Sequence, residues 1–138
     1  MIELLFATAL LHLQPECHAV MSNGRPPPSI CPVWELVATS SQGQHFFHEP
    51  RSRRGSATVF ELRTWIIWPV DQADGSRSVE VFSNYDCVRR TVTSLRAATY
   101  TADGRMVRAA PVTGASAAPR SARPGTPDAL LLDHHCRS

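Results

Sequence analysis

The sequence contains no lysine: all 14 of its basic residues are arginine, set against 12 acidic residues, for a formal net charge of +2. This excess is too small to indicate the concentrated basic face of a nucleic-acid binding protein, so no nucleic-acid partner is expected. The chain also lacks an apolar run of about 20 residues, so no transmembrane segment is expected. It has no nucleophile elbow, phosphate-binding glycine loop or catalytic pair of carboxylates. These absences predict a protein that is not an enzyme and holds no cofactor.

The first 19 residues have the features of a secretory signal. Leu4 to Leu13 is a nearly unbroken apolar run of suitable length, and cleavage is expected after Ala19, where small residues stand at the usual positions. Glu3 is unusual for a signal, which normally begins with a basic residue, and the alternative is a short buried helix. Residues 20–32 are rich in proline and predict an extended spacer. A single folded domain is therefore expected over residues 33–136.

Alternating apolar and polar side chains predict an α+β fold built on an antiparallel, meander-like sheet of about five to six strands. The clearest strand covers 58–68, where Glu61 and Arg63 are expected to keep one face partly in water. The arginine-rich segment 49–55 and the low-complexity segment 110–125 are predicted to be loops, the second of them mobile. The other expected strands cover 33–40, 44–48, 78–87, 91–100 and 105–109.

A short helix is predicted at the C-terminal end of the domain. Thr126 can cap it, Pro127 suits its first position, and Asp128 favours the positive end of the helix dipole. Residues 129–136 make only about two turns, and a helix of that length is marginal in water by itself. It must therefore be packed against the sheet or tied to it.

Four cysteines predict disulfides in an oxidising compartment and metal or redox chemistry in a reducing one, and the signal favours the first. A zinc site on the thiolates of Cys87 and Cys136 is the rival interpretation, although the paired short spacings of structural zinc sites are absent. The pairing of Cys17 and Cys31 stays open. Four aromatic residues are candidates for a binding surface, or else for the core: Trp65, Trp68, Tyr85 and Tyr100.

Two groups of metal-ligating residue types stand in the sequence, and neither predicts a metal site. His45 and His48 are three residues apart on an expected strand, so they point to opposite faces and do not converge. Residues 133–136 (Asp-His-His-Cys) are consecutive on an expected helix, where neighbours diverge by about 100°. Each group, taken by itself, is unable to surround one ion.

Several short motifs stand in a characteristic order. They are VWELV (33–37), FFHEP (46–50), VFELRTW (59–65), Asp86-Cys87, and RPGTP (123–127) followed by a leucine run and Cys136. This order resembles that of the surface-adhesin protein E family, small bacterial exported proteins. The sequence departs from the family in lacking a tryptophan shortly before the closing motif, where residues 112–122 stand instead.

The resemblance implies that the C-terminal helix is pinned to the sheet by a disulfide between Cys87 and Cys136. Such a bond would lower the conformational entropy of the unfolded chain and would thereby stabilise the folded domain by roughly 4 kcal/mol. The resemblance also implies a periplasmic, outer-surface-associated or secreted protein, and the founding activity of the family is adhesion to host extracellular proteins. We therefore expect a non-enzymatic binding module that contacts extracellular or envelope proteins. The alternatives are an envelope structural protein without a recognition role, and a small redox or metal-binding protein that uses its cysteines. The oligomeric state stays open.

Overall fold

The computed structural model describes residues 34–137. The predicted signal peptide (1–19) and spacer (20–32) lie outside the described residues, as do Cys17 and Cys31. Within the described part of the chain, no helix is long and apolar enough to cross a membrane.

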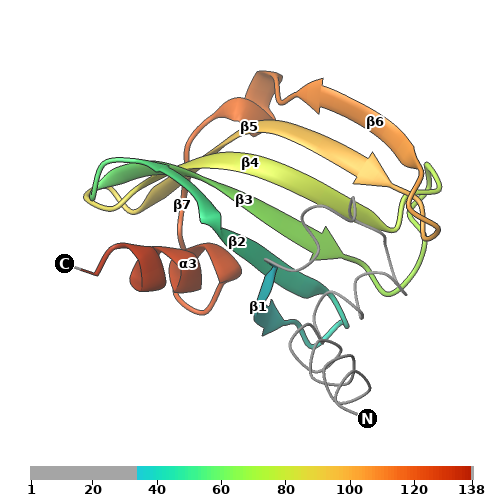
Figure 1. Ribbon diagram of the computed structural model, residues 1–138, viewed down its shortest axis with the longest axis horizontal. Helices are drawn as coiled ribbons and strands as arrows, with labels where there is room; N and C mark the ends of the chain where they lie inside the picture. Colours follow the sequence, from blue (N-terminus) through green and yellow to red (C-terminus); the bar gives the residue numbers. More distant parts are fainter. Residues whose placement is uncertain (1–33, 138) are drawn as a thin grey trace, which may run out of the picture.

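Six antiparallel strands follow one another across the sheet in chain order, which confirms the predicted meander (Figure 1). A two-residue strand, β7 (Arg120–Ser121), pairs with β5, and the chain ends in α3 (Pro127–His135). The six strands are β1 (Glu35–Thr39), β2 (His45–Gly55), β3 (Val59–Ile67), β4 (Ser78–Asp86), β5 (Thr91–Tyr100) and β6 (Met106–Pro111).

The prediction that residues 49–55 form a loop is wrong, because β2 continues through them to Gly55. The pairing with β3 slips between Glu49 and Arg54 and then resumes with Arg54 opposite Glu61. Ser52 fills the slip: its hydroxyl donates to the carbonyl of Glu49 at 2.7 Å and accepts from the backbone N–H of Arg63 at 2.9 Å. A bulge of this kind shifts the alternation of side chains, so the sequence pattern does not show the strand.

The segment 110–125 is also more regular than predicted. It contains the 3-10 helix η2 (Gly114–Ala117) and β7, whose residues pair with Thr91 and Val92 at the start of β5. β6 pairs with the other half of β5, between Arg96 and Tyr100. The low-complexity segment therefore completes the sheet beside the part of β5 that β6 does not cover.

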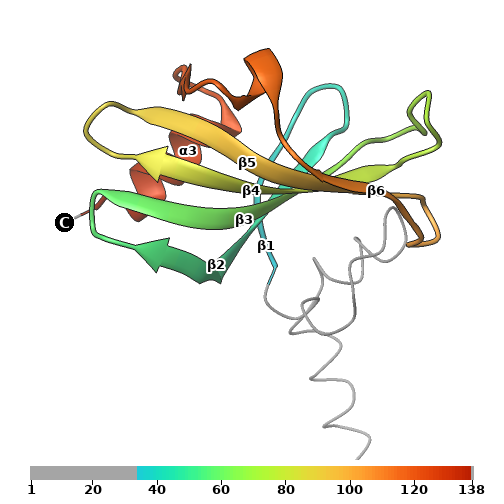
Figure 2. The ribbon, with the colours of Figure 1, turned by 90° about the horizontal axis from the view of Figure 1, so that it is seen from above.

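The sheet carries a hydrophobic core on each face. One core lies under α3, which Figure 2 shows on one side of the sheet. It consists of Phe60, Leu62, Tyr85, Val92, Leu131 and Leu132. The other core lies on the opposite face and consists of Trp34, Phe47, Trp65, Ile67 and Tyr100. Both faces of the central strand β3 are therefore apolar along much of its length. Successive side chains of this strand point alternately into the two cores, rather than into one core and into water.

The helix begins as the sequence predicts. The side chain of Thr126 accepts a hydrogen bond from the backbone N–H of Ala129 at 3.3 Å, and Pro127 is the first helical residue. Ala129, Leu131 and Leu132 are buried against the sheet. Packing of this apolar face stabilises a helix of nine residues that would be marginal alone.

Candidate functional site

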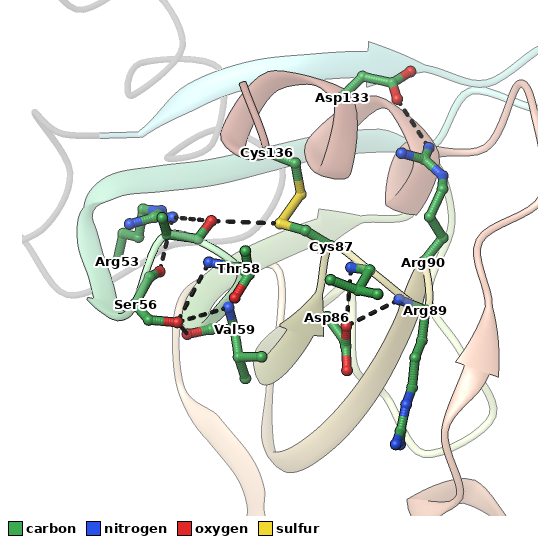
Figure 3. Close-up of a disulfide and its surroundings, with 12 residues drawn as sticks. Arg53, Ser56, Thr58, Val59, Asp86, Cys87, Arg89, Arg90, Asp133 and Cys136 are labelled. Carbon is green, nitrogen blue, oxygen red and sulfur yellow. Dashed lines mark hydrogen bonds and ion pairs between the residues drawn. A yellow bond between two sulfur atoms is a disulfide. The ribbon is translucent and has the colours of Figure 1, made fainter. Parts of the chain in front are cut away.

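A disulfide joins Cys87, directly after β4, to Cys136, directly after α3 (Figure 3). The two Cα atoms lie 5.7 Å apart, within the ordinary range for a disulfide. This bond confirms the pairing that the family resemblance implies. It also contradicts a zinc site on these two thiolates, since their sulfurs are bonded to each other.

The turn that carries Cys87 is stabilised by its neighbour Asp86. The Asp86 carboxylate accepts hydrogen bonds from the backbone N–H groups of Val88 and Arg89, both at 3.0 Å (Figure 3). Arg90, the last residue of the turn, reaches across to α3 and pairs with Asp133 at 2.9 Å. The turn after β4 and the end of α3 are therefore held together by a covalent bond and by an ion pair.

Three of the four aromatic residues proposed as a binding surface are buried, and they lie on different faces of the sheet. Trp65 is 0% exposed and stacks on Tyr100 in the core away from α3, with ring centroids 5.1 Å apart. Tyr85 stacks on Phe60 in the core under α3 at 5.3 Å. Trp68, just after β3, is half-buried. These residues do not form one surface, and three of them serve as core.

Burial also changes the chemistry of Tyr85. Removal from water raises the pKa of its phenol well above the usual range, and the nearby Asp128 carboxylate adds to the shift. This tyrosine therefore stays neutral wherever the domain is folded at ordinary pH.

Arg63 is held between two carboxylates on the face away from α3. Its guanidinium lies 2.8 Å from Glu49 and also pairs with Glu80. It further contacts the rings of Trp34 and Phe82, with centroids 5.5 and 5.3 Å away. The expectation that Glu61 and Arg63 keep this face partly in water holds at Glu61, which is exposed, but not at Arg63. Only 18% of the Arg63 side chain is exposed, because two carboxylates pair with its charge.

A shallow groove of about 400 Å³ lies on the same face, over β4, β5 and β6. Small side chains, Ala98 and Ala109 among them, form its floor, and Tyr100 and Met106 line one end. Arg96 lines it as well and lies 3.9 Å over the ring of Phe82. Among residues 34–137, β6 pairs only with β5, so its outer backbone edge is unpaired, and residues of the same strand line the groove.

Three histidines meet where the end of α3 crosses β2: His48, His134 and His135, called here the histidine cluster. The ring of His48 lies on the helix side of β2, and its Nδ1 is 3.1 Å from Nε2 of His135. The sequence pattern does not reveal this cluster, because neither histidine group converges by itself and the two groups meet only in the folded chain. The cluster takes one residue from the strand and two from the helix, 86 and 87 positions later.

Two members of the histidine cluster, His48 and His135, have a lowered pKa that favours the neutral imidazole. Burial, together with the nearby His48, His134 and Arg53, lowers the pKa of His135 to about 4. Burial also lowers the pKa of His48, against the opposing effect of the Glu35 carboxylate. Neutral imidazole carries a free nitrogen lone pair, which makes it a hydrogen-bond acceptor and a metal ligand.

The model of the surface-adhesin protein E family matches residues 34–137, which is the whole of the chain that the structure describes. The chain belongs to this family. No curated protein matches it at a significant level. Membership in the surface-adhesin protein E family implies an exported, surface-associated protein with a non-enzymatic binding role toward extracellular proteins.

Proposed function

We propose that this protein is a non-enzymatic binding module of the cell envelope that contacts extracellular or envelope proteins after export to the periplasm, the outer surface or the medium. The family match over residues 34–137 is the observation that carries the proposal. The architecture supports it, because a disulfide fastens the helix to the sheet within only 104 described residues, as in other small domains that work outside the cytosol.

The surface proposed for partner binding is the groove over β4 to β6 together with the outer edge of β6. Met106 is 58% exposed at one end of the groove, and the stacked Arg96 lies toward the other end. Methionine, arginine and aromatic side chains are enriched at protein interfaces. The open edge of β6 offers backbone N–H and C=O groups to an extended segment of a partner, which would add a strand to the sheet. The apolar groove would receive the side chains of that strand.

Binding of the intact, disulfide-bonded protein to a panel of purified extracellular-matrix and serum proteins tests the proposal. We expect at least one partner to bind, and Met106→Glu to weaken that binding about tenfold or more by placing a charge at the groove. Biolayer interferometry against each immobilised protein measures both results.

Val88→Glu is the matched control. Val88 is 80% exposed in the turn after β4, at a distance from the groove along the strand, and receives the same change from an apolar side chain to a carboxylate. It should bind as the unaltered protein does. Absence of binding to every panel member would favour the structural envelope role, and equal weakening by both substitutions would refute the proposed surface.

A further inference from the structure

The nitrogen atoms of the histidine cluster are already close to the spacing that a metal ion requires. One ligand atom from each of the three residues lies within 4.8 Å of the other two. Around a tetrahedral Zn²⁺ with Zn–N bonds of about 2.0–2.1 Å, neighbouring ligand atoms are roughly 3.3 Å apart. The 3.1 Å between His48 Nδ1 and His135 Nε2 is near this value. His134 is exposed, so rotation of its side chain can bring it nearer.

Glu35 orients the central member of the cluster. Its carboxylate lies 3.3 Å from Nε2 of His48, on the side of the ring opposite His135. When the Nε2–H of His48 donates a hydrogen bond to this carboxylate, Nδ1 of His48 carries the free lone pair. That lone pair is directed at the cluster. Carboxylates in this position fix the tautomer of metal-binding histidines and increase their basicity.

We propose that His48, His134 and His135 bind one divalent transition-metal ion, with Zn²⁺ the best fit, and that Glu35 supports His48 from behind. Three imidazoles are a donor set suited to Zn²⁺, Cu²⁺ and Ni²⁺ rather than to Ca²⁺ or Mg²⁺, which prefer oxygen. The metal takes the place of the hydrogen that His135 Nε2 donates to His48 Nδ1, and that proton moves through solvent to Nδ1 of His135, which stays a neutral imidazole. No oxidation or proton loss is required.

The proposed site has a fourth position open to a cavity. A pocket of about 250 Å³ lies beside the cluster and is lined by Glu35, His48 and His134 together with apolar residues of β1 and α3. Three protein ligands with one open position are typical of sites that hold water or an external ligand, whereas closed structural sites use four. Water, or a carboxylate supplied by a bound molecule, would complete the coordination.

Charges around the cluster partly oppose each other. Arg53 is close enough to His135 to lower its pKa, and it disfavours an additional positive ion. Glu35 acts in the other direction through His48. Asp133 is engaged by Arg90 and is not counted as a ligand. The site therefore has three imidazole donors and one supporting carboxylate, a set that predicts moderate rather than extreme affinity.

A bound metal would fasten α3 to a second strand. The disulfide joins the end of α3 to the turn after β4, whereas the cluster joins the preceding residues of α3 to β2. Because the ion binds the folded arrangement, it should raise the stability of the domain with the logarithm of its concentration once that exceeds the dissociation constant.

Calorimetric titration of the full, disulfide-bonded protein with Zn²⁺ tests the inference, using protein without a polyhistidine tag and stripped of metal beforehand. We expect one Zn²⁺ per chain and an increase in melting temperature on addition of Zn²⁺. His134→Gln should weaken binding by about tenfold or more, and Glu35→Gln by a factor on the order of ten. Both residues are exposed, so both variants should remain folded.

His45→Gln is the matched control. His45 is on the same strand and bonds Thr39 at 3.0 Å, outside the cluster. It should bind Zn²⁺ as the unaltered protein does. The inference is overturned if the unaltered protein does not bind Zn²⁺, or if His134→Gln and His45→Gln weaken binding equally, since equal losses indicate adventitious binding to surface histidines. It does not depend on the proposed function, because neither variant alters the groove over β4 to β6.

Discussion

At the scale of single residues, Arg63 shows how one side chain can reverse the character of a sheet face. A charged residue in the middle of a strand normally marks the side that faces water. Here Glu49 and Glu80 pair with the guanidinium, and the rings of Trp34 and Phe82 cover it. The face is therefore closed by an ion cluster in which one guanidinium pairs with two carboxylates, and its stability depends on that single positive charge.

Replacement of Arg63 by leucine should lower the free energy of unfolding by on the order of 3 kcal/mol, because it leaves two largely buried carboxylates without a counter-charge. Urea unfolding followed by tryptophan fluorescence measures the change. Arg105→Leu is the control, since 78% of the Arg105 side chain is exposed and its pair with Asp103 lies at the surface. It should change stability by no more than about 0.5 kcal/mol. Comparable losses of unfolding free energy from the two substitutions would show that the ion cluster contributes no more to stability than a surface ion pair does.

At the scale of elements, α3 depends on contacts that its own sequence does not supply. Its nine residues are capped by Thr126, and three of them are buried against the sheet. The disulfide then fixes its last turn to the end of β4. Local propensity starts the helix, packing orients it, and the covalent bond limits how far it can depart from the sheet.

Removal of the disulfide by the double substitution Cys87→Ser and Cys136→Ser should cost about 4 kcal/mol of stability, because the unfolded chain regains the entropy of a loop closed across 49 positions. Urea unfolding gives the difference, and hydrogen exchange should show the largest loss of protection in α3. The unaltered protein in excess reductant should behave as the double variant does. A helix that keeps its full protection without the bond would show that packing alone holds it.

At the scale of the whole molecule, two cores on opposite faces of one sheet make global stability sensitive to groups buried on either side. Tyr85 is the largest ionisable group within the core under α3 and is 1% exposed. Burial raises the pKa of its phenol above the value of about 10 that it has in the unfolded chain. Alkaline pH should therefore act on the folding equilibrium of the entire domain through this residue.

Stability should be unaffected by Tyr85 below about pH 10 and should fall above it, since the unfolded chain then loses a proton that the folded chain keeps. The loss from this residue should reach about 1.4 kcal/mol at pH 11 and continue until the folded pKa is passed. Tyr85→Phe should remove this part of the pH dependence, while Tyr100 contributes equally to both proteins. Urea unfolding at pH 8 and pH 11 measures it, and an identical decline in the two proteins would contradict the assignment.

The sequence by itself determined the antiparallel meander, the capped C-terminal helix and, through its resemblance to a family, the Cys87–Cys136 bond. These features depend on local alternation, on local capping chemistry and on motifs whose order is visible along the chain. The bulged second half of β2 was not visible, because an irregular register disrupts the alternation of side chains. The backbone groups at the bulge are hydrogen-bonded by a hydroxyl from within it, and this contact leaves no periodic signal in the sequence.

Only the tertiary structure decided which residues are surface and which residues meet. It placed Trp65 and Tyr85 in separate cores, and it enclosed Arg63 between carboxylates. It also brought His48 to the two histidines of α3. The physical reason is the same in each case: burial and convergence depend on what packs against a side chain from distant parts of the sequence, and periodicity within one strand or helix carries no information about that partner.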